Sequence, residues 1–184
     1  MVAFYSHPSF KVAGFLAKWF TSITDFSPKH KIENSIIFAN DLSNLQFPYD
    51  SKLFSIDAVS MFTKIPVLYT IDLMLKLLRD KQIPEGIIQE FGTLIKHCLK
   101  DNICFFRNRI YKFPDGLPMG GPLSTLVSEV FMSHLENEIL STAPDELLYY
   151  KRYIDDIFGV WNGSDGTLKV FLDKMRQFHA SMDF

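Results

Sequence analysis

Apolar residues recur at helical spacing over several stretches of the chain. In residues 9–24 the large apolar side chains fall three or four positions apart, which predicts a buried helix. Ser27-Pro28 ends this stretch, and Asn34 is placed to cap a second, shorter helix. The same spacing predicts further helices over residues 66–81, 84–99 and 123–140 and from about residue 167 onward.

Shorter apolar runs between turn residues predict strands. Residues 52–57 form one such run, and residues 103–113 form a hairpin around Arg107-Asn108. Residues 147–154 and 157–161 are two more strands, joined by a tight turn at Asp155-Asp156. The order of the elements predicts an α+β fold, in which a small antiparallel sheet has helices packed on one face.

Composition narrows the class of protein. The chain has 184 residues, 47% of them hydrophobic, which is long and apolar enough for a folded core. A formal net charge of −2 argues against strong autonomous nucleic-acid binding, because phosphate neutralisation usually requires a basic domain. Cys98 and Cys104 have no zinc-ligand spacing, and no apolar stretch is long enough to span a membrane. We therefore expect reduced thiols, no membrane insertion and an intracellular location, nuclear or cytoplasmic.

Three carboxylates are candidates for a metal site. Asp155 and Asp156 lie between two apolar strands, where neighbouring negative charges repel and a hard cation such as Mg²⁺ relieves the repulsion. Asp57 ends another apolar strand and would complete a site for two ions if the strands are neighbours. The alternatives are structural: an Asp pair is common in hairpin turns, and Asp57 suits a strand end.

Residues 114–122 form a loop rich in Gly and Pro between the two acidic sites. Glycine lets a backbone approach a ligand closely, and Pro122 suits the start of the helix that follows. A plain turn is the alternative for this loop. Lys151 and Arg152 either face nucleic-acid phosphate or form a solvated pair.

These motifs resemble those of reverse transcriptases, in the family's order and spacing. Residues 53–66, which include Phe-Ser-Ile-Asp57, are similar to motif A. Residues 116–136, beginning Gly-Leu-Pro-Met-Gly-Gly-Pro, are similar to motif B, and residues 150–158, with Tyr-Ile-Asp-Asp, to motif C. Two segments most resemble the corresponding sequences of Penelope-like retroelements: Phe-Thr-Lys-Ile-Pro (residues 62–66) and Lys-Arg-Tyr-Ile-Asp-Asp-Ile-Phe (residues 151–158).

The resemblance implies a polymerase palm that adds dNTPs to a DNA primer on an RNA template, with two Mg²⁺ ions. It implies that Asp57 and Asp155 are the principal metal ligands and catalytic residues, with Asp156 beside them. Phe62 matches the steric gate against ribose. The substrate-binding residues it implies are Ala58, Phe62, Gly116, Pro118, Met119 and Gly120. Three departures from the family pattern concern template positioning: no Gln precedes the loop, and Gly121 and Thr125 replace the usual Ser and Pro.

The resemblance also suggests a domain division. Residues 1–50 are expected to be partial fingers or connecting helices, and residues 51–184 the palm. Basic finger motifs and a thumb are not visible, which predicts a fragment. Two alternatives remain: a non-catalytic remnant that retains the fold, and a metal-dependent phosphohydrolase or nuclease, which leaves Phe62 and the Gly116 loop unexplained.

Overall fold

The computed structural model describes residues 9–100, 103–107, 109–112, 115–118, 120–177, 179 and 181–182. The chain divides into two compact units. Unit 1 contains residues 1–27 and 60–132, and unit 2 contains residues 28–59 and 133–184. Each unit is described by itself, because their relative placement is not determined.

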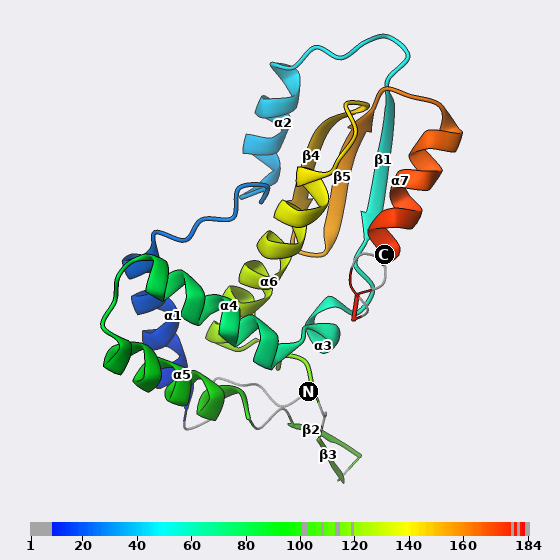
Figure 1. Cartoon of the computed structure of the whole chain (residues 1–184). Helices are drawn as coiled ribbons and strands as arrows, with labels where there is room; N and C mark the ends of the chain where they lie inside the picture. The colour runs from blue at the N-terminus through cyan, green and yellow to red at the C-terminus, as the bar shows by residue number, and fades with distance from the viewer. Residues whose placement is uncertain are drawn as a thin grey trace. The chain divides into compact units, whose positions relative to one another are not determined.

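Unit 1 is built on three helices that lie side by side, α1 (Phe10–Thr24), α4 (Val67–Asp80) and α5 (Glu85–Leu99) (Figure 1). Their apolar faces meet: Phe20 of α1 stacks on Phe91 of α5 with ring centroids 5.7 Å apart. Met74 and Ile88 are fully buried. Unit 1 also contains α3 (Met61–Lys64), the hairpin β2 (Ile103–Phe106) and β3 (Arg109–Lys112), and the first part of α6 (Pro122–Ser141).

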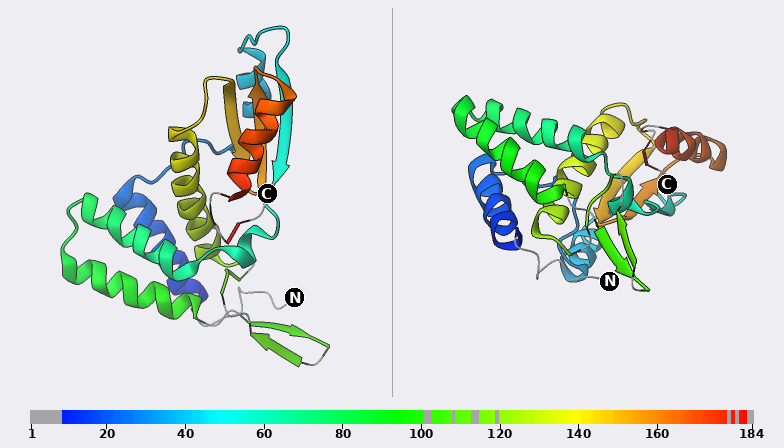
Figure 2. Two further views of the ribbon diagram at one scale, coloured as in Figure 1. Left: turned by 45° about the vertical axis from the view of Figure 1, so that its right-hand side comes forward. Right: turned by 90° about the horizontal axis from the view of Figure 1, so that it is seen from below.

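Unit 2 contains a three-stranded antiparallel sheet in the order β1 (Lys52–Asp57), β5 (Asp156–Trp161), β4 (Leu147–Tyr153). Helix α7 (Asp165–Gln177) covers one face, as the rotated views of Figure 2 also show. Phe171 of α7 stacks on Trp161 at 5.3 Å. Phe38 of α2 (Ser35–Ser43) meets Phe158 edge-on at 5.3 Å. The sheet is thereby fixed by aromatic contacts from two helices.

A glycine in the middle strand makes room for an aromatic ring of the neighbouring strand. A Cβ atom at Gly159 would lie 2.2 Å from the ring of Phe54, its partner residue on β1. No side chain fits there, so the Phe54 ring lies directly over the glycine backbone. This close contact joins β1 to β5 three residues from Asp57, the last residue of β1, and from Asp156, the first residue of β5.

The structure confirms the fold class and most elements expected from the sequence. Asn34 caps α2 as predicted: its Oδ1 accepts the N–H groups of Ile36 and Ile37 at 3.0 and 2.9 Å. Helix α3 was missed, because four residues are too few for a helical period to be recognised. Helix α7 begins two residues earlier than predicted, where the Oγ of Ser164 accepts the Thr167 N–H. Within the described residues no helix is long and apolar enough to cross a membrane.

Candidate active site

The strand register of unit 2 places two of the three candidate carboxylates face to face. Asp57, the last residue of β1, is the antiparallel partner of Asp156, the first residue of β5. Opposite residues of an antiparallel pair project to the same face, with Cα atoms roughly 4.5–5.5 Å apart. Both side chains are exposed. Two negative charges therefore share one face at the end of the sheet.

The turn that joins β4 to β5 consists of Ile154 and Asp155. The prediction of a turn at Asp155-Asp156 was wrong by one residue, because strand pairing continues through Tyr153 and Asp156. Ile154 has a φ of 57°, in the left-handed region. This backbone conformation costs an L-residue roughly 1–2 kcal/mol and is unusual for a β-branched side chain. The surroundings of the turn must therefore impose its shape.

Two hydrogen bonds hold the turn from opposite sides. The N–H of Ala58, directly after Asp57, donates to the carbonyl of Asp155 at 3.0 Å. The guanidinium Nη1 of Arg152 donates to the carbonyl of Ile154 at 2.7 Å. Ala58, expected to bind substrate, has a buried side chain, and its backbone N–H ties β1 to the turn.

A buried ion pair lies beneath the turn. The Nε of Arg152 is 2.6 Å from Oε1 of Glu136 on α6, and both side chains are only 1% exposed. The hydroxyl of Tyr150 donates to the same oxygen at 3.3 Å. Burial, reinforced by the Glu136 charge, raises the pKa of Tyr150 well above its usual value. Both sequence interpretations of Arg152, a phosphate contact or a solvated residue, were wrong.

Sequence reasoning did not identify Glu136 and Arg152 as a pair. Sixteen residues separate them, and one lies on a helix while the other lies on a strand. The alternation of β4 could have indicated that Arg152 is buried. Successive strand residues face opposite sides of the sheet, so either Arg152 or its neighbour Tyr153 must face the core.

The three carboxylates fit a divalent cation by their chemistry. Asp155 precedes Asp156 by one residue, so all three Cα atoms lie within about 10 Å of one another. Hard cations such as Mg²⁺ prefer carboxylate oxygen, and two like charges facing each other gain from a cation between them. In the described part of the chain, no three His, Cys, Asp or Glu side chains are gathered as metal ligands. The role of Asp57, Asp155 and Asp156 as ligands stays a prediction.

Unit 1 brings the end of motif A to the motif B loop. Phe62 lies half-buried on α3, and its carbonyl accepts the Leu117 N–H at 2.7 Å. Gly116 has a φ of 89°, and a Cβ atom there would lie 2.6 Å from the carbonyl oxygen of Thr63. Only glycine satisfies both constraints. Phe62 and Gly116, both expected to bind substrate, are thus backbone neighbours.

The rest of the loop is partly described. The carbonyl of Pro118 accepts a hydrogen bond from the Ser124 hydroxyl of α6. Gly120 is exposed and has a φ of 84°. Met119, the remaining predicted substrate-binding residue, lies outside the described residues.

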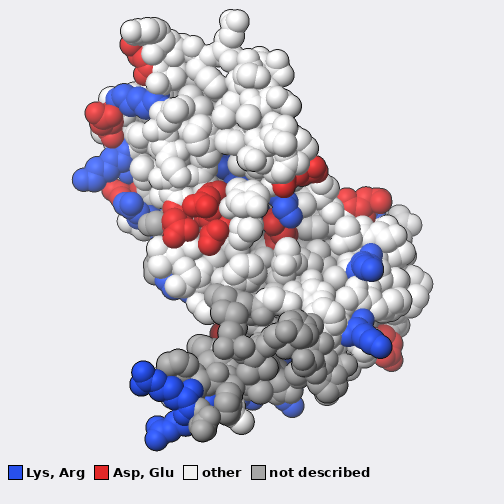
Figure 3. Space-filling model, turned by 180° about the vertical axis from the view of Figure 1, so that it is seen from behind, with Lys and Arg blue, Asp and Glu red and all other residues white. Residues whose placement is uncertain are grey.

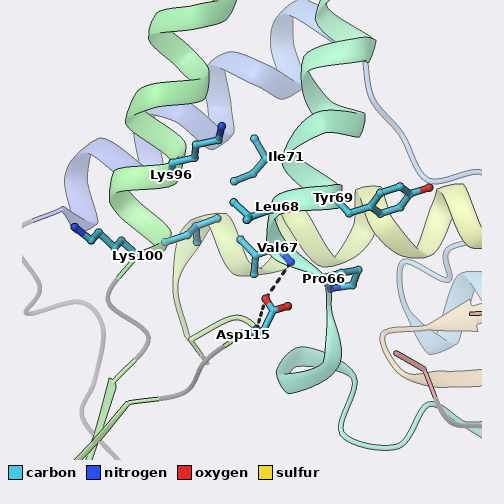
Figure 4. A pocket seen from close by; sticks show the side chains of 10 residues that line it. Pro66, Val67, Leu68, Tyr69, Ile71, Lys96, Lys100 and Asp115 are labelled. Atoms are coloured by element: carbon cyan, nitrogen blue, oxygen red, sulfur yellow. Dashed lines mark hydrogen bonds between the residues drawn. The ribbon is translucent and has the colours of Figure 1, made fainter. Parts of the chain in front are cut away.

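A pocket of about 320 Å³ opens at the start of α4 in unit 1 (Figure 4). Asp115 caps this end of the helix, because its Oδ1 accepts the Val67 N–H at 3.2 Å. Lys96 of α5 and Lys100, the residue directly after this helix, also line the pocket, four positions apart in the sequence. Gly116 also lines it. The predicted substrate-binding loop thus borders a pocket with two lysines and one aspartate.

Acidic and basic side chains both reach the surface. On the face that Figure 3 displays, acidic side chains gather in a patch near the middle, basic side chains lie mainly toward the edges, and uncharged residues cover most of the rest outside the grey residues. The formal net charge of −2 agrees with this mixture.

Comparison with known protein families matches most of the chain to one family. Residues 13–184 match the family described as reverse transcriptase (RNA-dependent DNA polymerase). The match covers far more than half of the chain, so the chain belongs to the reverse transcriptase family. Members of this family generally use divalent metal ions.

A solved structure supports the same fold. The chain is similar to apo telomerase from Candida tropicalis truncated from its C-terminal domain, with a TM-score of 0.60 and 15% sequence identity. The similarity covers 97% of this chain and 40% of that one. At this identity the likeness concerns the fold alone. Comparison with curated protein sequences gave no significant match.

Proposed function

We propose that this chain carries the catalytic palm of an RNA-directed DNA polymerase, which adds dNTPs to a primer 3′-OH on an RNA template. The observation that supports this most is the pairing of Asp57 with Asp156 at the end of the sheet. Asp155 lies in the adjoining turn. Family membership supports nucleic-acid and nucleotide substrates.

Asp57, Asp155 and Asp156 are the residues that would hold two Mg²⁺ ions. When bound, such ions activate the attacking hydroxyl and stabilise the charge on the leaving pyrophosphate. The chain's own contribution is position. The Ala58–Asp155 hydrogen bond holds the turn against β1, and the sheet register holds Asp57 opposite Asp156.

Phe62 and the loop of residues 116–120 would contact the incoming nucleotide and the template. The hydrogen bond between Phe62 and Leu117 supports this, because it makes the proposed ribose gate and the loop one backbone unit. A bulky side chain that meets the ribose 2′ position favours dNTPs over NTPs.

Finer assignments also remain proposals. The amino-acid sequence of residues 62–66 and 151–158 supports a Penelope-like subtype. The division into a finger part (residues 1–50) and a palm (residues 51–184) follows the motif order. An intracellular location agrees with a polymerase that copies nucleic acid.

Primer extension tests the proposal. Because the sequence predicts a fragment, the chain is joined to finger and thumb segments of an intact reverse transcriptase. This chimera is incubated with an RNA template, a DNA primer, dNTPs and Mg²⁺, and its extension is compared with that of its Asp155→Asn variant. Asp50→Asn, in an exposed turn, is the matched control. We expect extension by the chimera and by its Asp50→Asn control, and none by its Asp155→Asn variant or by the chain alone, because substrate alignment depends on the added segments. Extension by Asp155→Asn at the wild-type rate contradicts the proposed site.

A folded chimera that extends nothing favours the alternative, a non-catalytic remnant, and robust extension by the chain alone contradicts the expectation of a fragment. A nuclease or phosphohydrolase predicts shortened primers instead. The same gel distinguishes these outcomes.

A further inference from the structure

The Glu136–Arg152 ion pair is almost completely buried. Both side chains are 1% exposed, and the charged atoms are 2.6 Å apart. A buried pair of charges often stabilises a fold no better than apolar residues of similar size. Its presence in the apolar interior beside the sheet therefore needs another explanation.

The position of Arg152 supplies one. Its Nε contacts Glu136, and its Nη1 donates to the carbonyl of Ile154 at 2.7 Å. Ile154 is the residue whose backbone has a φ of 57°. The guanidinium fork thus joins α6 to the strained residue of the turn, with a rigid planar group between them.

The Arg152 bond is one half of a clamp around Asp155. The peptide group before Asp155 is held through the Ile154 carbonyl by Arg152. The peptide group after it is held through the Asp155 carbonyl by the Ala58 N–H. With both flanking peptide groups fixed, the direction of the Cα–Cβ bond of Asp155 is fixed as well. The side chain of Asp155 therefore leaves the backbone in a fixed direction, at the end of the sheet where Asp57 also lies.

We propose that Glu136 and Arg152 are positioning residues that orient the Asp155 carboxylate for cation binding. This inference rests on the proposed function. Glu136 holds the guanidinium, Arg152 holds the turn, and the turn presents the carboxylate. Substitution of residues that orient a metal ligand in this way typically costs about 10- to 100-fold in metal affinity or activity.

Binding of Mn²⁺ alone, followed by electron paramagnetic resonance, tests the inference on the full chain. Arg152→Met removes the donor to Ile154 and keeps a long side chain. The double variant Glu136→Gln/Arg152→Met removes both charges, so that no unpaired charge is left buried. Phe171→Leu on α7 is the control, since it disturbs a buried contact with Trp161 on β5, away from the turn. All variants are measured where circular dichroism shows them folded.

We expect about tenfold or greater weakening of Mn²⁺ binding in both Arg152 variants and wild-type affinity in Phe171→Leu. Amide hydrogen exchange gives a second readout without metal: the Ala58 N–H should exchange faster in the Arg152 variants only. The conservative variant Arg152→Lys should bind Mn²⁺ with intermediate affinity. A lysine ammonium keeps the positive charge but lacks the planar guanidinium that contacts both Glu136 and the Ile154 carbonyl.

The outcomes separate the two claims. Wild-type Mn²⁺ affinity in folded Arg152 variants overturns the positioning role and leaves the proposed function standing. Equal weakening in Phe171→Leu also overturns it, because the effect is then general destabilisation. If the wild type binds Mn²⁺ no better than Asp155→Asn, the proposed metal site fails, and the inference fails with it.

Discussion

Asp57 and Asp156 lie directly opposite each other across β1 and β5, with both carboxylates on one face of the sheet. Such a pair of like charges opposes the folded state unless a cation lies between them. Each carboxylate ends or begins its strand, where it remains exposed. Both the free energy of unfolding and the affinity for a cation should therefore depend on these two carboxylates.

Removing one charge of the pair should stabilise the metal-free protein. For Asp156→Asn in EDTA and low salt, we expect the free energy of unfolding to rise by roughly 0.2–1 kcal/mol, because repulsion from Asp57 is relieved. Urea denaturation measures the change. The control Asp50→Asn, in an exposed turn, should leave the free energy unchanged. A loss of stability in Asp156→Asn indicates that the carboxylates do not repel.

Mg²⁺ should stabilise the wild type by binding the folded state alone. At 100 times the dissociation constant the gain is about 2.7 kcal/mol, visible as a higher melting temperature. Asp155→Asn should lose most of this gain, and Asp50→Asn should keep it. NaCl at equal ionic strength corrects for general screening. Equal stabilisation of the wild type and Asp155→Asn argues against the metal site.

Ile154→Gly tests the backbone strain of the turn. Glycine adopts a φ of 57° without steric cost, which releases about 1–2 kcal/mol, whereas its added flexibility costs about 0.5–1 kcal/mol. We expect unchanged or modestly raised stability in urea denaturation. The neighbouring Tyr153→Gly, within strand β4, should lower it. If both substitutions destabilise the protein equally, the turn is not strained.

Phe62 should govern the choice of sugar. Phe62→Ala should raise the ratio of NTP to dNTP incorporation about 10-fold or more, since removing a bulky contact admits the ribose 2′-OH. Single-nucleotide primer extension by the chain joined to finger and thumb segments measures the ratio. Phe62→Tyr keeps the bulk and should behave as the wild type. An unchanged ratio in Phe62→Ala assigns the gate to another residue.

His30 should make unit 2 less stable in mild acid. Burial, with smaller effects from Lys29 and Lys151, lowers the pKa of His30 below its ordinary value of about 6.5. The unfolded chain then takes up a proton before the folded chain does. The stability contributed by neutral His30 is therefore present above pH 6.5 and is lost as pH falls through the folded-state pKa.

The measurement is the difference in melting temperature between the wild type and His30→Gln from pH 7.5 to 5. We expect the wild type to lose stability relative to the variant as pH falls. Parallel curves for the two proteins contradict the shift.

The order of helices and strands followed from local patterns. The spacing of apolar residues predicted α1, α4 and α5, and the Asn34 cap of α2 was confirmed by two hydrogen bonds. These features depend on neighbours within about one helical turn, which the sequence displays directly. The hairpin turn was displaced by one residue, because its place depends on cross-strand pairing at Asp156.

The sequence by itself determined which residues carry the candidate chemistry: three aspartates, a phenylalanine and a glycine-rich loop in the order of a reverse transcriptase. Only the tertiary structure decided that Asp156 faces Asp57 and that Arg152 is buried against Glu136. A strand position alternates between two faces, so sequence alone leaves open which face meets the core. The register of β1 against β5 and the packing of α6 on the sheet make that choice, because they join residues far apart in the chain.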